Sequence, residues 1–193
     1  SRRLVESLFD DTAGDSNYDY AVLDTAYEAG KAQFSAALQK YSPDIVICFG
    51  VAARDTAIRL EQTARNVVLP DTEDAAGHKP GCDYICNGTY GYGATLPHDA
   101  IKSVLEKNNI SVRLSGDAGA YLCNYIFYHL MKHISETGAP MIGGFVHIPD
   151  TDDETLKRAA RIIIEETAAH ADMNARPRIL RHPGKDNLSW DID

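Results

Sequence analysis

The chain has 193 residues, of which 44% are apolar, and its formal net charge at pH 7 is −9. This length and apolar content suffice for one substantial core, so we expect a single domain over residues 1–193 with an irregular tail from about residue 176. The acidic residues are spread along the chain without a basic stripe, which disfavours nucleic acid and anionic membranes as partners. The longest apolar runs, such as Ile45 to Gly50, fall far short of the roughly 20 residues of a transmembrane helix.

The cysteine content indicates a reducing environment. The four cysteines are too few and too irregularly spaced for a disulfide framework in a chain of this size. They are Cys48, Cys82, Cys86 and Cys123. A cytoplasmic location is therefore expected.

The first half of the chain predicts strands and helices in alternation. Tyr20 to Asp24 is short and β-prone, and Ala29 to Tyr41 has apolar residues at helical spacing. Asp44 to Gly50 is a continuous apolar run closed by glycine, which is typical of a strand buried on both faces of a parallel sheet. Thr56 to Thr63 is amphipathic but brief, and Val67 to Leu69 predicts another short strand.

The second half continues the alternation after a long loop over residues 70–92, which is rich in Gly, Asp, Thr and Asn. The predicted elements are a helix over His98–Asn108, a strand over Ser111–Ser115, a helix over Tyr121–Ser135, a strand over Met141–Ile148 and a helix over Asp153–Ala171. We therefore predict an α/β fold, a three-layer α/β/α sandwich with a mostly parallel twisted sheet. Such sheets bind ligands at the carboxyl ends of their strands.

Cys123 is a candidate nucleophile. It follows a strand and a small-residue turn, and it falls in the first turn of a predicted helix. The helix dipole and the free N–H groups there are expected to lower the pKa of the thiol and to hold a developing oxyanion. The alternative is a small buried residue that packs a helix onto a sheet.

Two further residues match the chemistry of a cysteine nucleophile. His147 ends a predicted buried strand, where α/β enzymes place a general base. Glu61 follows the strand that ends at Gly50, and a carboxylate there can orient an imidazole. Spacing alone also allows a structural histidine and a solvated helix carboxylate.

The residues around these three side chains resemble those of pyroglutamyl peptidase I, a cysteine peptidase family also called pyrrolidone-carboxylate peptidase. The matching segments, in the order of the family, are Asp44–Gly50, Leu60–Asn66, Leu69–Asp71, Gly116–Asn124 and Gly143–Pro149. The family triad consists of the glutamate of Glu-Arg-x-Ala-x-Asn, the cysteine of Ala-Gly-x-x-x-Cys-Asn and the histidine of Gly-Gly-Phe-x-His-x-Pro. These positions fall on Glu61, Cys123 and His147.

The resemblance implies hydrolysis of the amide bond after an N-terminal pyroglutamyl residue, through an acyl-enzyme on Cys123. Peptides with a blocked N-terminus are then the substrates, neither a metal nor an organic cofactor is needed, and a homo-oligomer, a dimer or tetramer, is expected. Tyr121 and Leu122 match family positions that wall the pocket for the pyroglutamyl ring. We expect Val51 and Leu69 to contribute to substrate binding as well.

The chain also departs from the family. The family opens with a strand and a Gly-Phe-x-Pro-Phe-Gly loop that the sequence does not show, so the opening strand is expected to be absent. Residues after Gly50 and Glu61 differ from the usual ones. These differences leave open a non-catalytic or specificity-shifted paralogue that binds another N-acyl amide, and the numerous tyrosines leave open an interaction protein.

Two metal-like patterns are weak. Cys82 and Cys86 have three residues between them instead of two, and no second pair follows. His129 and His133 share a helix face but lack the glutamate of a zinc-protease helix. We predict no metal site from either pair.

Overall fold

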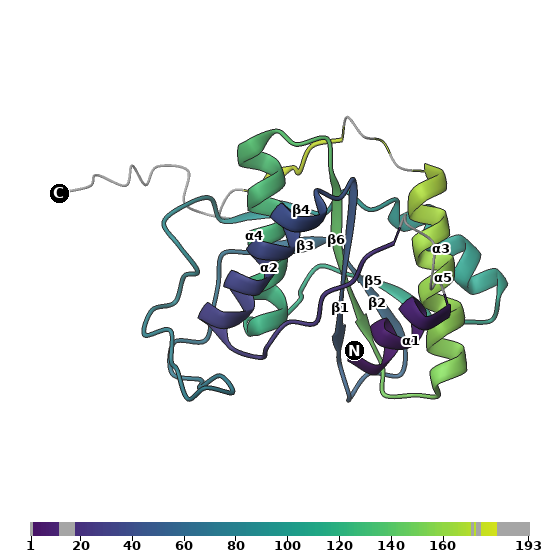
Figure 1. The fold of residues 1–193 in the computed structure, drawn as a ribbon, viewed down its shortest axis with the longest axis horizontal. Helices are drawn as coiled ribbons and strands as arrows, with labels where there is room; N and C mark the ends of the chain where they lie inside the picture. Colours follow the sequence, from purple (N-terminus) through teal and green to yellow (C-terminus); the bar gives the residue numbers. More distant parts are fainter. Residues whose placement is uncertain (1, 12–17, 171, 173–174, 181–193) are drawn as a thin grey trace.

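The computed structural model describes residues 2–11, 18–170, 172 and 175–180, and these form three layers (Figure 1). Helices α2 (Tyr27–Tyr41) and α4 (Leu122–Thr137) cover one face of the central sheet. Helices α1 (Arg2–Asp11), α3 (His98–Lys107) and α5 (Asp153–His170) cover the other. The predicted α/β/α sandwich is confirmed.

Within the described residues, the central sheet has four strands in the order β1-β6-β2-β5. They are β1 (Ile45–Val51), β6 (Ile142–Ile148), β2 (Ile58–Glu61) and β5 (Val112–Ser115). β1 pairs with β6 and β2 with β5 in parallel, whereas β2 and β6 are antiparallel. The sheet is therefore mostly parallel, as predicted, with one strand pairing of opposite sense at its centre.

A second, antiparallel sheet lies beside α4, which contacts its first two strands. Its strands are β3 (Thr63–Arg65), β4 (Gly91–Gly93) and β7 (Ile179–Leu180). β7 lies in the segment predicted to be an irregular tail, and it pairs with β4 through Leu180 and Ile179.

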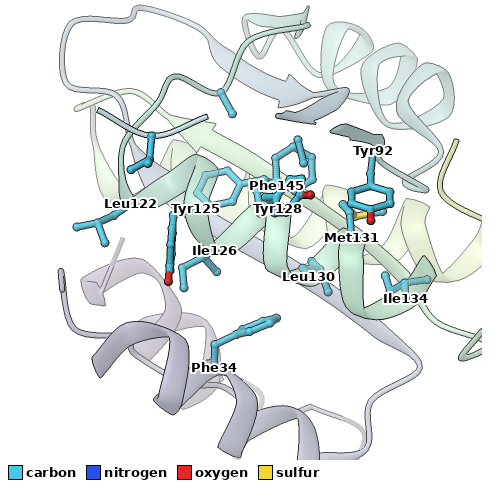
Figure 2. Packing of buried hydrophobic residues seen from close by; sticks show 14 of the residues in the cluster. Phe34, Tyr92, Leu122, Tyr125, Ile126, Tyr128, Leu130, Met131, Ile134 and Phe145 are labelled. Carbon is cyan, nitrogen blue, oxygen red and sulfur yellow. The ribbon is translucent and has the colours of Figure 1, made fainter. Parts of the chain in front are cut away.

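Two hydrophobic cores lie on opposite faces of the central sheet. The alternation of side chains along β6 sends Phe145 toward α4, while Val146 packs on the face of α3 and α5. On the α4 side, Tyr125, Leu130 and other residues of the helix fill the space between Phe34 of α2 and Phe145 of the sheet (Figure 2). The core on this side thus fixes α4, and with it the start of that helix, against the sheet.

Three predicted elements differ from the structure. Residues 18–24 form no strand, and the N–H group of Asp24 donates to the side chain of Gln33 instead of to the backbone of a neighbouring strand. The backbone N–H groups of Val68 and Leu69 also donate to two separate segments, at Asp83 and Ala120, so no strand forms there. Tertiary context outweighs local β-propensity in both cases, because neither segment pairs with a strand within the described residues.

The third difference concerns the brief amphipathic segment around Glu61. It is strand β2, in which Ile58 and Leu60 pack into one core while Arg59 and Glu61 point to the opposite face. Apolar and charged residues alternate with a period of two, which is the pattern of a strand. Among the described residues, no helix is both long and apolar enough to cross a membrane.

The core beneath α4 gives a stability prediction. Leu130 is completely buried, so Leu130→Ala should lower the free energy of unfolding by about 2–5 kcal/mol, measured by urea denaturation. The matched control is Ile179→Ala, since Ile179 is 58% exposed, and its effect should stay within about 0.5 kcal/mol. Equal effects of the two substitutions would contradict the assignment of this core.

Candidate active site

The register of the central strands brings charged side chains together on the α4 face. In the antiparallel pair of β2 and β6, Arg59 lies opposite His147 and Glu61 lies opposite Phe145. Alternate residues of a strand point to the same face, so all four side chains share it. The intervening residues Leu60 and Val146 are buried in the core on the other face.

Glu61 and His147 form a buried hydrogen-bonded pair. Oε1 of Glu61 lies 2.7 Å from Nδ1 of His147, and the two residues are 0% and 4% exposed. A carboxylate only accepts hydrogen bonds, so Nδ1 carries the proton that it donates, and in the neutral ring Nε2 then has a free lone pair. The ring of Phe145 packs against the imidazole, with 4.8 Å between ring centroids. The pair therefore presents a histidine base with a fixed tautomer and a fixed ring plane.

The thiol of Cys123 lies over the same face. Cys123 is the second residue of α4, and a Cβ atom placed on Gly50 of β1 would lie 2.8 Å from its sulfur. Gly50 is the register partner of His147 in the parallel pair of β1 and β6, and such partners point to the same side of a sheet. Sulfur and imidazole are thus on one face of the sheet, above neighbouring strands. Phe145 fills the remaining space above Gly50.

Burial raises the pKa of Cys123 to about 11, with Glu61 adding to the rise and Arg59 opposing it. The pKa is therefore raised rather than lowered as expected from the helix start, and the largest cause is the removal of the thiol from water. The thiol is protonated near neutral pH, so its use as a nucleophile requires a base that takes its proton. The imidazole of His147 lies on the same face and is a group that can accept this proton.

Asparagine side chains fix the start of α4 in a way that the sequence did not reveal. Asn124, directly after Cys123, is fully buried. Its amide accepts from the N–H of Arg65 at 3.0 Å and donates to the carbonyls of Arg65 and Val67 at 2.8 and 3.0 Å. Asn66 makes three similar bonds to Ile85 and Cys86 in the long loop. Both asparagines belong to the motifs that match the family. The motifs therefore marked these positions, but they did not reveal the hydrogen bonds to the backbone that the side chains make.

The carboxylate of Asp117, in the turn before α4, is paired with neighbouring groups. Its carboxylate binds the guanidinium of Arg65 and accepts from the N–H of Gly119 at 2.8 Å. These contacts shape the turn that precedes Cys123.

Comparison with known proteins accounts for this constellation. The sequence model of the family described as pyroglutamyl peptidase matches residues 1–167. The chain belongs to the pyroglutamyl peptidase family. It is 34% identical over 148 residues to the pyrrolidone-carboxylate peptidase of Bacillus subtilis, which covers 76% of this chain and 69% of that protein.

Solved structures of the family have the same fold. The crystal structure of Bacillus amyloliquefaciens pyroglutamyl peptidase I superposes with a TM-score of 0.81 at 28% identity, over 88% of this chain and 89% of that one. A mutant pyrrolidone carboxyl peptidase from Pyrococcus furiosus gives a TM-score of 0.81 at 27% identity, over 87% and 89% of the two chains. The fold and the family therefore agree with the resemblance of the motifs.

The four residues predicted to bind substrate differ in their surroundings. Tyr121 is half-buried, and its hydroxyl donates to the carbonyl of Glu73 at 3.0 Å, whereas Leu122 is buried in the core under α4. Val51, next to Gly50, is 47% exposed, and Leu69 is 45% exposed and donates its N–H to Ala120. Tyr121 and Leu69 thus have exposed surface near the start of α4, whereas Val51 follows Gly50 on β1 and its side chain points to the opposite face of the sheet, with Ile47 and Phe49.

Metal ligands do not gather within the part of the chain that the structure describes, where no three His, Cys, Asp or Glu side chains come close enough to share an ion. Cys82 lies near the carbonyl of Tyr84, and Cys86 lies 3.8 Å from the hydroxyl of Tyr128. Burial lowers the pKa of His129 to about 4. These residues belong to the packing of the long loop and α4.

Close packing above Gly50 gives a prediction for this pyroglutamyl peptidase fold. The added methyl of Gly50→Ala meets Cys123 and the ring of Phe145 within 2.9 Å, so both must shift. We expect a loss of about 1–3 kcal/mol in stability and about 10²-fold in activity, measured by urea denaturation and turnover of a pyroglutamyl amide.

The control for this substitution is Gly116→Ala. A Cβ atom on Gly116 meets nothing within 4 Å, so stability and activity should stay near those of the unmodified chain. A Gly50→Ala protein as active as the Gly116→Ala protein would contradict the placement of the thiol.

Proposed function

We propose that the chain is a cysteine exopeptidase that hydrolyses the amide bond after an N-terminal pyroglutamyl residue, with Cys123, His147 and Glu61 as its catalytic triad. The observation that carries the proposal is the buried 2.7 Å bond between Glu61 and His147 on the sheet face that also holds Cys123. Membership of the pyroglutamyl peptidase family and relatives named pyrrolidone-carboxylate peptidase support the choice of substrate.

In the acylation step, Nε2 of His147 takes the proton of Cys123 and the sulfur attacks the carbonyl carbon of the pyroglutamyl residue. A tetrahedral intermediate forms. When the C–N bond breaks, the protonated imidazole gives its proton to the leaving amine, and the pyroglutamyl group remains on the sulfur as a thioester. Glu61 steadies the imidazole in both proton transfers because it accepts from Nδ1 throughout.

In the deacylation step, His147 takes a proton from water and the oxygen attacks the thioester carbonyl. The C–S bond breaks, the sulfur regains the proton from His147, and pyroglutamate leaves. The cycle consumes one water and needs no other reactant.

The start of α4 provides the donors for the developing oxyanion. Tyr121 precedes the helix without a side-chain hydrogen bond to cap it, and the first N–H to bond within this turn is that of Tyr125, to the carbonyl of Tyr121. The N–H groups of the first turn, which includes Cys123, have no partner within the helix. They carry the positive end of the helix dipole next to the sulfur, where the oxyanion forms.

The remaining features of the proposal concern the substrate and its setting. Tyr121 and Leu69 are proposed to contact the pyroglutamyl ring and the following residue of peptides with a blocked N-terminus, while Leu122, buried next to Cys123, supports this wall from within the core. Residues 1–193 are proposed to act as a single peptidase domain within a cytoplasmic homo-oligomer, a dimer or tetramer.

A fluorogenic pyroglutamyl amide tests the proposal. Cys123→Ala should reduce turnover to background, and Glu61→Gln should reduce kcat/KM by about 10²- to 10⁴-fold because the histidine loses its carboxylate partner. The control is Cys48→Ala, since Cys48 is a second cysteine on β1, two residues before Gly50, and takes part in no proposed step. Turnover that survives Cys123→Ala, or binding of the amide by the unmodified protein without any turnover, would refute the proposal.

A further inference from the structure

Arg59 lies against the Glu61–His147 pair, and the proposed triad does not use it. Its Nε is 3.0 Å from Oε1 of Glu61, and its Nη2 is 3.0 Å from Nδ1 of His147. The side chain is 19% exposed, so the guanidinium is mostly removed from water. A cation in this position acts on both members of the pair.

The two contacts of Arg59 require different protonation states of Nδ1 of His147. A guanidinium N–H donates to Nδ1 only when that nitrogen has no proton, yet Nδ1 must keep its proton to donate to Glu61 at 2.7 Å. In the state that leaves Nε2 free for Cys123, the productive contact of Arg59 is therefore the one with the carboxylate. Glu61 is 0% exposed, so this ion pair supplies the opposite charge that water does not.

The guanidinium is itself anchored on its far side. Its Nη1 lies 3.2 Å from Oδ2 of Asp55, whose other oxygen lies 3.1 Å from Nη2 of Arg113. Arg113 on β5 is the register partner of Arg59, which in turn faces His147 on β6. Asp55 thus contacts two neighbouring arginines, and its own ion pair with Arg59 anchors the guanidinium of that residue.

We propose that Arg59 is a positioning residue of the active site: anchored by Asp55, it holds the Glu61 carboxylate in the orientation in which Oε1 accepts the Nδ1 proton of His147. It acts through Glu61 and does not touch the substrate. The inference rests on the proposed function for the role of His147 as a base, but the placement of Arg59 on the pair stands on geometry alone.

A double-mutant cycle in kcat/KM for the pyroglutamyl amide tests this role. Arg59→Met should reduce kcat/KM by about 10- to 100-fold, mainly through kcat, because the base is misplaced while substrate contacts remain. In the Glu61→Gln background, Arg59→Met should change kcat/KM by less than about threefold, because the residue through which it acts is already altered. Equal losses in both backgrounds would overturn the proposal.

Conservative and neighbouring substitutions separate positioning from general stability. Arg59→Lys keeps the charge and should recover part of kcat, whereas it lacks the second arm that reaches Asp55. Arg113→Met removes the other partner of Asp55 without touching the pair, so it should retain kcat/KM within about threefold. A loss in Arg113→Met as large as that in Arg59→Met would contradict the proposal. If Arg59→Met does not fold, the Arg59→Lys substitution with and without Glu61→Gln provides the same comparison.

A measurement without substrate keeps this test independent of the proposed activity. The charged and titratable groups around the sulfur are Glu61 and Arg59 on β2, His147 on β6, Cys48 on β1 and Tyr121 before α4. Alkylation of Cys123 by iodoacetamide, followed by peptide mass spectrometry at fixed pH, should slow when Arg59→Met is made in the unmodified chain, change little when it is made in Glu61→Gln, and stay unchanged in Arg113→Met. Absence of pyroglutamyl turnover by the unmodified protein would contradict the proposed function alone. Alkylation of Arg59→Met at the rate of the unmodified protein would contradict the role of Arg59.

Discussion

The buried carboxylate of Glu61 is the constraint on which the centre of this structure depends. A charge without access to water is stable only beside opposite charge and hydrogen-bond donors, and Glu61 has the guanidinium of Arg59 and the imidazole of His147 within 3.0 Å of one oxygen. Both partners are available because β2 runs antiparallel to β6, which sets Arg59 opposite His147 and Glu61 one step further along the same face. The antiparallel pairing of β2 with β6 is therefore what brings Arg59 and Glu61 to the imidazole of His147.

Packing places the sulfur of Cys123 on the same sheet face as the imidazole of His147. Gly50 lacks a side chain, and the space above it is filled by the sulfur of Cys123 and the ring of Phe145. The helix that carries Cys123 is held by a hydrophobic core along its length and by the amide of Asn124 at its start. Burial that gives this precision of placement also raises the pKa of Cys123 to about 11, so placement and dependence on a base have the same cause.

The sequence was sufficient for the layers, for four of the five helices at nearly their observed bounds, and for the strands on either side of Cys123, because those elements have long apolar periodicity. Short elements whose state depends on distant partners were not predictable in the same way. The segment around Glu61 is a strand only because β5 and β6 flank it, and Tyr20 to Asp24 forms none because nothing in the described residues pairs with it.

The residues of the site also divide into those that the sequence predicted and those that it missed. Motif resemblance pointed to Cys123, His147 and Glu61, and the structure brings the first two to one sheet face and bonds the last two to each other. The place of Arg59 was missed because its meaning lies in strand register, although a charged residue two positions before Glu61 in an alternating segment was the available signal. The pKa of Cys123 was predicted in the wrong direction because sequence reveals a helix start but not the depth of burial.

The most direct test of this account is the position of the proton on the His147 ring, measured by ¹H–¹⁵N NMR of the imidazole nitrogens and assigned by comparison with His147→Gln. The account predicts a neutral ring with a proton on Nδ1, seen as a strongly hydrogen-bonded N–H signal that disappears in Glu61→Gln, and an unprotonated Nε2. A resting ring protonated on Nε2 alone, with Nδ1 accepting from Arg59, would contradict it, because such a ring has no free lone pair for the thiol of Cys123.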